Sequence, residues 1–152
     1  MKFISEIEID KVIERLNDEG EFDKASKNLI ENQPALIGYL DGEGFKILTS
    51  EEQDLLWYCL LVVVESSSPG YAVSVQDLLD KEEENYDLVG DQMTFDIIAD
   101  QLFEEYGQED LLAFVEDTLI PDEETFITPV GRKVLFLSLK SVIDVLDMQE
   151  ST

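Results

Sequence analysis

The chain has 152 residues, of which 36 are Asp or Glu and 10 are Lys or Arg, and its formal net charge at pH 7 is −26. It has no histidine and one cysteine, which excludes imidazole-dependent catalytic triads, His-ligated zinc, internal disulfides and thiolate metal cages. Direct nucleic-acid binding is unexpected because the phosphate backbone repels negative charge, whereas a hydrophobic content of 44% and the length predict one folded domain over residues 1–152.

The first third of the chain predicts three helical segments. Ser5 and Glu8 have the spacing of a capping box, and apolar residues at helical intervals follow them, so that Gly20 is expected to end this helix. A second helix is predicted over residues 21–32. Pro34 is compatible with the first turn of a third helix.

The strongest predicted element is a helix over residues 51–66. Thr49 or Ser50 precedes it as a capping residue, with Glu or Gln three positions later. Ten consecutive apolar residues, 55–64, then cover every direction around the axis, which is typical of a buried helix. The run is also rich in valine and compatible with a buried strand, but the capping pattern favours the helix. It is too short to span a membrane, which takes about 20 residues.

Two acidic helices are predicted in the middle of the chain, over residues 75–86 and 92–106. Ser74 opens the first and Gly107 closes the second. A shorter helix is predicted around residues 111–119. The apolar faces of the two acidic helices are formed by Val75, Leu78, Leu79 and Tyr86, and by Phe95, Ile98, Leu102, Phe103 and Tyr106.

The last predicted helix covers residues 130–148 and begins at Thr128, which is followed by proline at the first helical position. Its apolar arc is wide, and its narrow polar stripe consists of Lys133, Lys140, Asp144 and Asp147. Arg132 and Lys133 stand at its start, where they would either bind an anion or pair with surrounding acids, and the pairing is favoured.

These elements predict an all-α fold, a compact single-domain bundle of about seven helices. The two apolar helices, 51–66 and 130–148, are expected at its centre, with the acidic helices of residues 74–119 packed around them. Residues 50–130 hold 22 acids and one base, a net charge of −21. These acids alternate with Leu, Ile, Val and Phe, which indicates charged faces of folded helices.

Carboxylates are the only abundant reactive groups. Two stripes form at helical spacing, Asp77, Asp80 and Glu84 on one acidic helix and Asp96, Asp100 and Glu104 on the other. Facing each other, they would supply the oxygen ligands that Mg²⁺ or Ca²⁺ takes, but their position opposite the apolar faces favours solvated surface. Glu82 instead falls on the apolar face, where burial would raise its pKa unless the helix frays or that face is only partly covered.

The function favoured by the sequence is a non-enzymatic interaction module that docks a basic protein partner through the acidic surface of residues 74–124. The predicted contact residues are Glu82, Glu83, Glu84, Asp96, Asp100 and Glu104. The alternatives are a carboxylate-only Mg²⁺- or Ca²⁺-binding module or metal-dependent enzyme, or a charge that serves only solubility or halotolerance. No cofactor and no membrane contact are predicted, the expected location is the cytoplasm, and a homo-oligomer is possible but not indicated.

Overall fold

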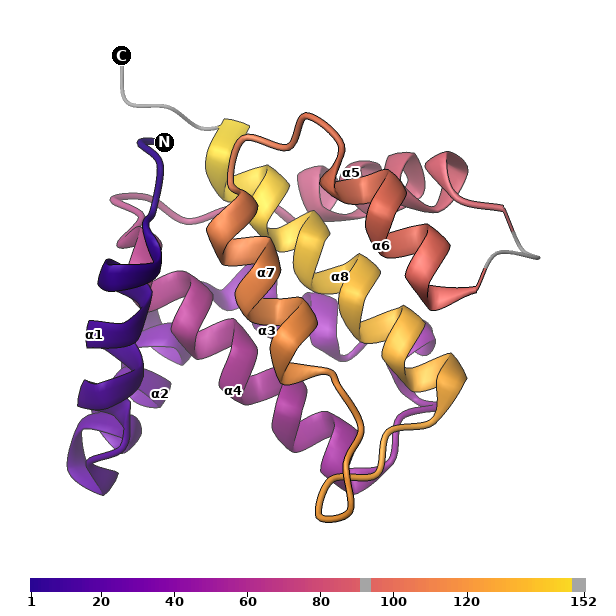
Figure 1. Ribbon diagram of the computed structural model, residues 1–152. Helices are drawn as coiled ribbons and strands as arrows, with labels where there is room; N and C mark the ends of the chain where they lie inside the picture. Colours follow the sequence, from indigo (N-terminus) through magenta and orange to yellow (C-terminus); the bar gives the residue numbers. More distant parts are fainter. Residues whose placement is uncertain (91–93, 149–152) are drawn as a thin grey trace.

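The computed structural model describes residues 1–90 and 94–148, and in these residues the chain forms eight α-helices and one short 3₁₀ helix with no strand (Figure 1). The predicted all-α class is therefore confirmed. In this described part, no helix has the length and apolar character needed to cross a membrane. The helices are α1 (Glu6–Leu16), α2 (Glu19–Asn32), α3 (Pro34–Leu40), η1 (Glu43–Phe45), α4 (Ser50–Ser67), α5 (Val75–Leu88), α6 (Phe95–Phe103), α7 (Glu109–Thr118) and α8 (Pro129–Met148).

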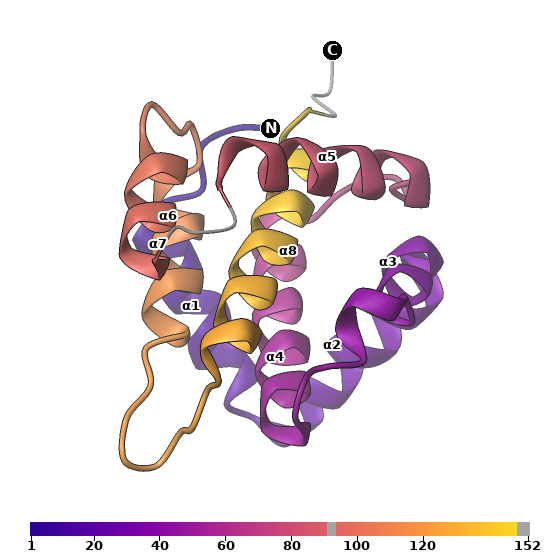
Figure 2. The same ribbon diagram turned by 90° about the vertical axis from the view of Figure 1, so that its right-hand side faces the viewer.

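Helices α4 and α8 form the centre of the fold, as predicted. Residues 59–63 of α4 and 135–143 of α8 are buried without interruption. The two helices pack on each other, α1, α2 and α7 pack on α4, and α5 packs along α8. Figure 2 shows α8 lying over α4, with the N-termini of both helices at the same end of the molecule. The core is thus built around a parallel helix pair.

Local capping signals set several helix starts. The capping boxes of Ser5 with Glu8 and of Thr49 with Glu52 are both present. The Ser74 side chain accepts a hydrogen bond from the backbone of Asp77, which confirms the predicted start of α5. Each interaction joins residues three positions apart, so it follows directly from the sequence.

Two predicted helix ends are wrong. Gly20 does not end α1, because the Asp18 side chain caps a new helix whose first turn contains Gly20. Gly107 does not close α6, because that helix already ends at Phe103, and Glu105 takes the left-handed conformation with φ 54°. α1 thus ends at Leu16 and Asn17 without a glycine, and after α6 the left-handed conformation expected of a glycine is taken by Glu105. The start predicted for this second acidic helix, at 92, lies outside the described residues.

The inward face of α5 also differs from the prediction. Val75 and Leu79 are exposed, 40% and 45% respectively, whereas Leu78 and Asn85 are buried. Leu78 and Asn85 are seven positions apart and share one side of the helix. α5 packs along α8, which leaves Val75 and Leu79, and also Leu88 at the end of the helix, in solvent.

We expect the stability of the fold to rise with ionic strength. With a net charge of −26 and mostly exposed carboxylates, self-repulsion destabilises the compact state, and salt screens it. Thermal unfolding followed by circular dichroism at pH 7 should show Tm increasing by at least about 4 °C between 10 mM and 500 mM NaCl, since about 1 kcal/mol corresponds to roughly 2–4 °C at this size. A Tm independent of NaCl would contradict this expectation.

Candidate functional site

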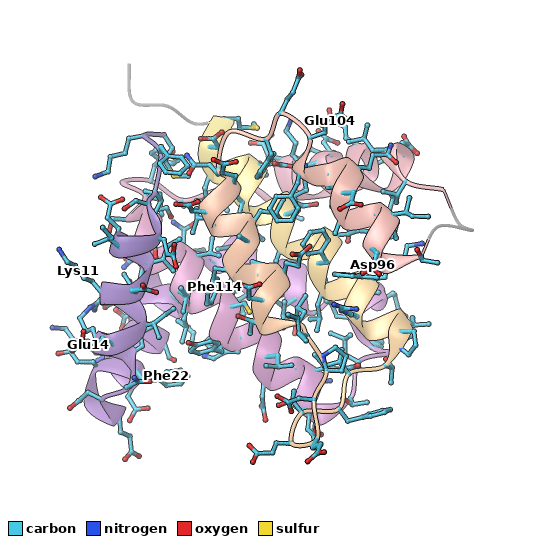
Figure 3. All side chains as sticks on the ribbon, viewed as in Figure 1. Lys11, Glu14, Phe22, Asp96, Glu104 and Phe114 are labelled. Atoms are coloured by element: carbon cyan, nitrogen blue, oxygen red, sulfur yellow. The ribbon has the colours of Figure 1, made fainter. Side chains whose placement is uncertain are left out.

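In the described residues, the two predicted carboxylate stripes are not brought together as a group of metal ligands. Asp80 and Glu84 of α5 and Asp96 and Asp100 of α6 are all exposed. Figure 3 shows Asp96 near the start of α6, while Glu104 projects from the molecule beyond the far end of that helix. Across residues 1–90 and 94–148, no three Asp, Glu or Cys side chains come together in an arrangement that would hold a metal ion. The hypothesis of a carboxylate metal site therefore gains no geometric support.

Glu82 is tied to a neighbouring helix. α5 continues to Leu88, so the helix does not fray at Glu82, whose side chain is partly buried. Its Oε1 accepts a hydrogen bond of 3.0 Å from the hydroxyl of Tyr39 in α3. Burial, and secondarily the charge of Glu82, raises the pKa of Tyr39. Glu82 therefore anchors α3 to α5, whereas Glu83, predicted to share its role, is exposed to solvent.

A groove of about 420 Å³ lies between α1 and α7. Its volume is within the range of about 300–1,000 Å³ that is typical of ligand sites. Apolar and aromatic side chains are interleaved with four carboxylates, and none of the lining residues is basic. The lining consists of Glu6, Ile9, Asp10, Ile13, Tyr58, Asp110, Ala113, Phe114, Asp117 and Thr118.

The two walls of this groove are held together at their N-terminal ends. The backbone N–H of Glu6 donates a hydrogen bond of 2.9 Å to Oδ2 of Asp110. The Gln108 amide accepts a 3.0 Å bond from the backbone N–H of Ile4 and donates a 2.8 Å bond to the carbonyl of Lys2. Since Gln108 is buried, these contacts fix the start of α1 against the start of α7.

The floor and the rim of the groove differ in chemistry. Tyr58 of α4 lies against Phe114 of α7, with ring centroids 6.1 Å apart, and burial raises the pKa of the Tyr58 hydroxyl. Asp10 and Asp117 are exposed at the rim, one on each wall. Figure 3 shows Lys11 projecting from the side of α1 that faces away from α7. The groove therefore offers an apolar floor between two acidic walls.

Sequence reasoning missed the contribution of α1 to this site. Glu6 and Asp10 are four positions apart and share a helix face, and this spacing is visible in the sequence. The acidic surface was instead predicted within residues 74–124, which contain only the α7 wall. The signal that was lacking is the pairing of α1 with α7, whose contacting residues Glu6 and Asp110 are 104 positions apart.

The predicted polar stripe on α8 is partly buried, in a group of polar side chains that we call the Lys140 cluster. It comprises Asn85, Tyr106, Lys140, Ser141 and Asp144. The Lys140 ammonium donates to Oδ1 of Asn85 at 2.7 Å and to Oδ2 of Asp144 at 2.9 Å, and it lies 4.7 Å from the ring centre of Tyr106. Lys140 is only 6% exposed, because α5 covers this part of the stripe. The cluster joins α5, α8 and the α6–α7 connection.

The cations at the start of α8 lie over aromatic rings. The guanidinium carbon of Arg132 is 3.7 Å from the ring centre of Phe95, and the Lys133 ammonium is 5.9 Å from that of Tyr86. Within residues 1–90 and 94–148, neither cation forms an ion pair at 4.0 Å or less. Stacking therefore replaces the close ion pairs that the sequence favoured.

No protein-family model, no curated protein and no solved structure matches this chain. The choice between candidate sites therefore depends on geometry and charge. The α1–α7 groove combines a concave apolar floor with a uniformly acidic rim, whereas the predicted α5 and α6 carboxylates Asp80, Glu83 and Asp100 are exposed. The groove is the strongest candidate for binding.

Proposed function

We propose that this protein is a non-enzymatic interaction module that docks a basic protein partner in the groove between α1 and α7. The observation that carries the proposal is the lining of the groove, where four carboxylates surround an apolar floor without a basic residue. A partner whose Lys or Arg residues flank an apolar side chain is complementary to this surface in both respects.

The two parts of the surface have different roles in binding. The floor, which includes Ile13, Tyr58 and Phe114, supplies apolar area that is removed from water on docking. The rim supplies charge complementarity, and the more distant exposed acids of α5 and α6 add to a negative field that speeds the encounter with a cation-rich partner. Binding should therefore weaken as salt is added. We place this interaction in the cytoplasm, because the one cysteine of the chain is a buried free thiol, which fits a reducing compartment.

Two triple variants test the proposal at equal change of net charge. The groove variant carries Glu6→Gln, Asp10→Asn and Asp117→Asn, three exposed rim positions. The control variant carries Glu83→Gln, Asp87→Asn and Glu104→Gln, three exposed positions on α5 and beyond α6. Each variant removes three negative charges, so the two have the same net charge and lose it at different places on the surface.

A display selection of random peptides against the unmodified protein alone should enrich peptides that combine Lys or Arg with apolar residues. Their binding should fall by about ten-fold or more in the groove variant and should weaken with rising NaCl. Three results would overturn the proposal: no enrichment, enrichment of acidic or uncharged peptides, or equal weakening in the two variants. Equal weakening would support a diffuse acidic surface and the predicted contacts on α5 and α6.

A further inference from the structure

We infer that the occupant of the α1–α7 groove is an amphipathic α-helix, with two or three apolar residues on one face and Lys or Arg on both sides of that face. This inference depends on the proposed function, because it names the form in which the basic partner enters the same groove. It is argued from the backbone of the walls, from the length of the groove and from the arrangement of its carboxylates.

The walls of the groove cannot pair with an extended peptide. α1 and α7 are both helices, so their N–H and C=O groups are bonded within each helix except at the ends. An extended chain lying on the apolar floor would bury its own backbone polar groups without partners, which is costly. A helix satisfies its backbone internally, so it can bury one face in the groove at no such cost.

The dimensions of the groove fit a short helix. Its lining extends from Glu6 to Ile13 on α1 and from Asp110 to Thr118 on α7, about two turns or roughly 10–12 Å on each wall at 1.5 Å per residue. An occupant helix of about three turns places apolar residues at i and i+4, and at i+3 or i+7, along the floor. A third helix beside α1 and α7 extends the helix packing already present in the fold.

The carboxylates stand on both sides of that path. Glu6 and Asp10 lie on the α1 wall, and Asp110 and Asp117 lie on the α7 wall. Cations on both flanks of the apolar face of the occupant would therefore meet acids on either side. A second copy of this chain does not supply such a face, because a net charge of −26 on each copy opposes self-association.

A designed peptide provides a defined probe. It is a helix-forming peptide with leucines at i, i+4 and i+7, lysines on both flanks of that face and a fluorescent label at one end. Its comparison peptide has the same sequence with two central residues in the D form, which breaks the helix and keeps composition and charge. Fluorescence anisotropy gives Kd for both peptides with the unmodified protein, the groove variant and the control variant.

We expect the helical peptide to bind at least about ten-fold more tightly than the D-containing peptide and to gain helical circular dichroism on binding. The groove variant should weaken its binding about ten-fold, and the control variant less than about three-fold. If both peptides bind equally and both weaken in the groove variant, the groove docks basic partners without requiring a helix, so this inference fails while the proposed function stands. If neither peptide binds, or the two variants weaken binding equally, both fail.

Discussion

Replacing Asp144 with alanine should lower the free energy of unfolding by about 3–5 kcal/mol, which is the usual cost of leaving a buried charge without its partner. Asp144 accepts hydrogen bonds from Lys140 and Asn85 at Oδ2, both 2.9 Å long, and from the Tyr106 hydroxyl at Oδ1, 2.5 Å long. The side chains of Lys140 and Asp144 are only 7% and 14% exposed. Without the carboxylate, the Lys140 ammonium stays in a covered site with the Asn85 amide oxygen as its remaining acceptor.

Urea unfolding at pH 7 checks this value, with Asp87→Ala on the exposed face of α5 as the matched control. The control should change the free energy of unfolding by less than about 0.5 kcal/mol. The double variant Lys140→Met with Asp144→Leu should recover only part of the stability, because it removes the unpaired buried charge but leaves the Asn85 amide oxygen and the Tyr106 hydroxyl without these partners. An Asp144→Ala variant within about 1 kcal/mol of the unmodified protein would show that water reaches the cluster and solvates Lys140.

The features of the fold that were predictable from the sequence are those that depend on residues close together in one helix. α4 and α8 were expected at the centre because their apolar residues surround the helix axis, and burial of such a helix follows from its own sequence. The capping boxes were predictable for a similar reason, since Ser5 with Glu8, and Thr49 with Glu52, are local pairs. Information within one turn of a helix was sufficient for these features.

The neighbours of each helix face were not predictable in the same way. Lys140 and Asp144 have the same spacing whether their stripe faces water or Asn85 of α5, 55 positions away from Lys140. Equally, Leu79 and Leu78 are adjacent apolar residues, and only the packing of α5 on α8 decides that Leu78 is buried and Leu79 exposed. Periodicity gives the faces of a helix, whereas tertiary packing decides which face is covered.

The acidic character of the candidate site was predicted from the sequence, but its position between α1 and α7 was not. The charge count indicated an acidic surface with a single base, Lys81, over residues 50–130, and Asp110 and Asp117 of the groove belong to that segment. The groove exists only because α1, from the first sixteen residues, packs beside α7. Without that pairing, Glu6 and Asp10 looked like ordinary solvated acids, and the apolar floor could not be recognised.

Glu52 likewise has a role in the folded protein that its local sequence does not reveal. Its position in a capping box was expected, but the structure buries its side chain completely and gives it a second helix to cap. Oε1 accepts a 2.9 Å bond from the backbone N–H of Thr49, and Oε2 accepts bonds of 2.7 and 2.8 Å from the N–H and hydroxyl of Thr128. One carboxylate thus lies at the N-termini of both central helices, where the helix dipoles favour negative charge.

This arrangement predicts that Gly131→Ala destabilises the protein by about 3 kcal/mol or more, although alanine ordinarily stabilises a helix interior by up to about 1 kcal/mol relative to glycine. A Cβ at position 131 would lie 2.1 Å from Oε2 of Glu52, so the buried carboxylate must move away from Thr128. The loss combines a cap at each helix, about 0.5–2 kcal/mol each, with a buried charge deprived of donors. Gly38→Ala in α3 is the control, because nothing lies within 4 Å of its added Cβ, and it should be neutral or stabilising.

The pH dependence of a Glu52→Gln variant separates the charge of Glu52 from its shape. Burial opposes the ionised form, but the hydrogen bonds from Thr49 and Thr128 outweigh it and hold the pKa of Glu52 below the usual 4.5. A lowered folded-state pKa means that the ionised group contributes its full stability above about pH 4.5 and loses it as the pH falls through the folded pKa. The difference in unfolding free energy between the unmodified protein and Glu52→Gln should therefore be largest near pH 7 and shrink towards pH 3. A difference that is constant over this range would mean that Glu52 acts by filling space and accepting hydrogen bonds, without a contribution from its charge.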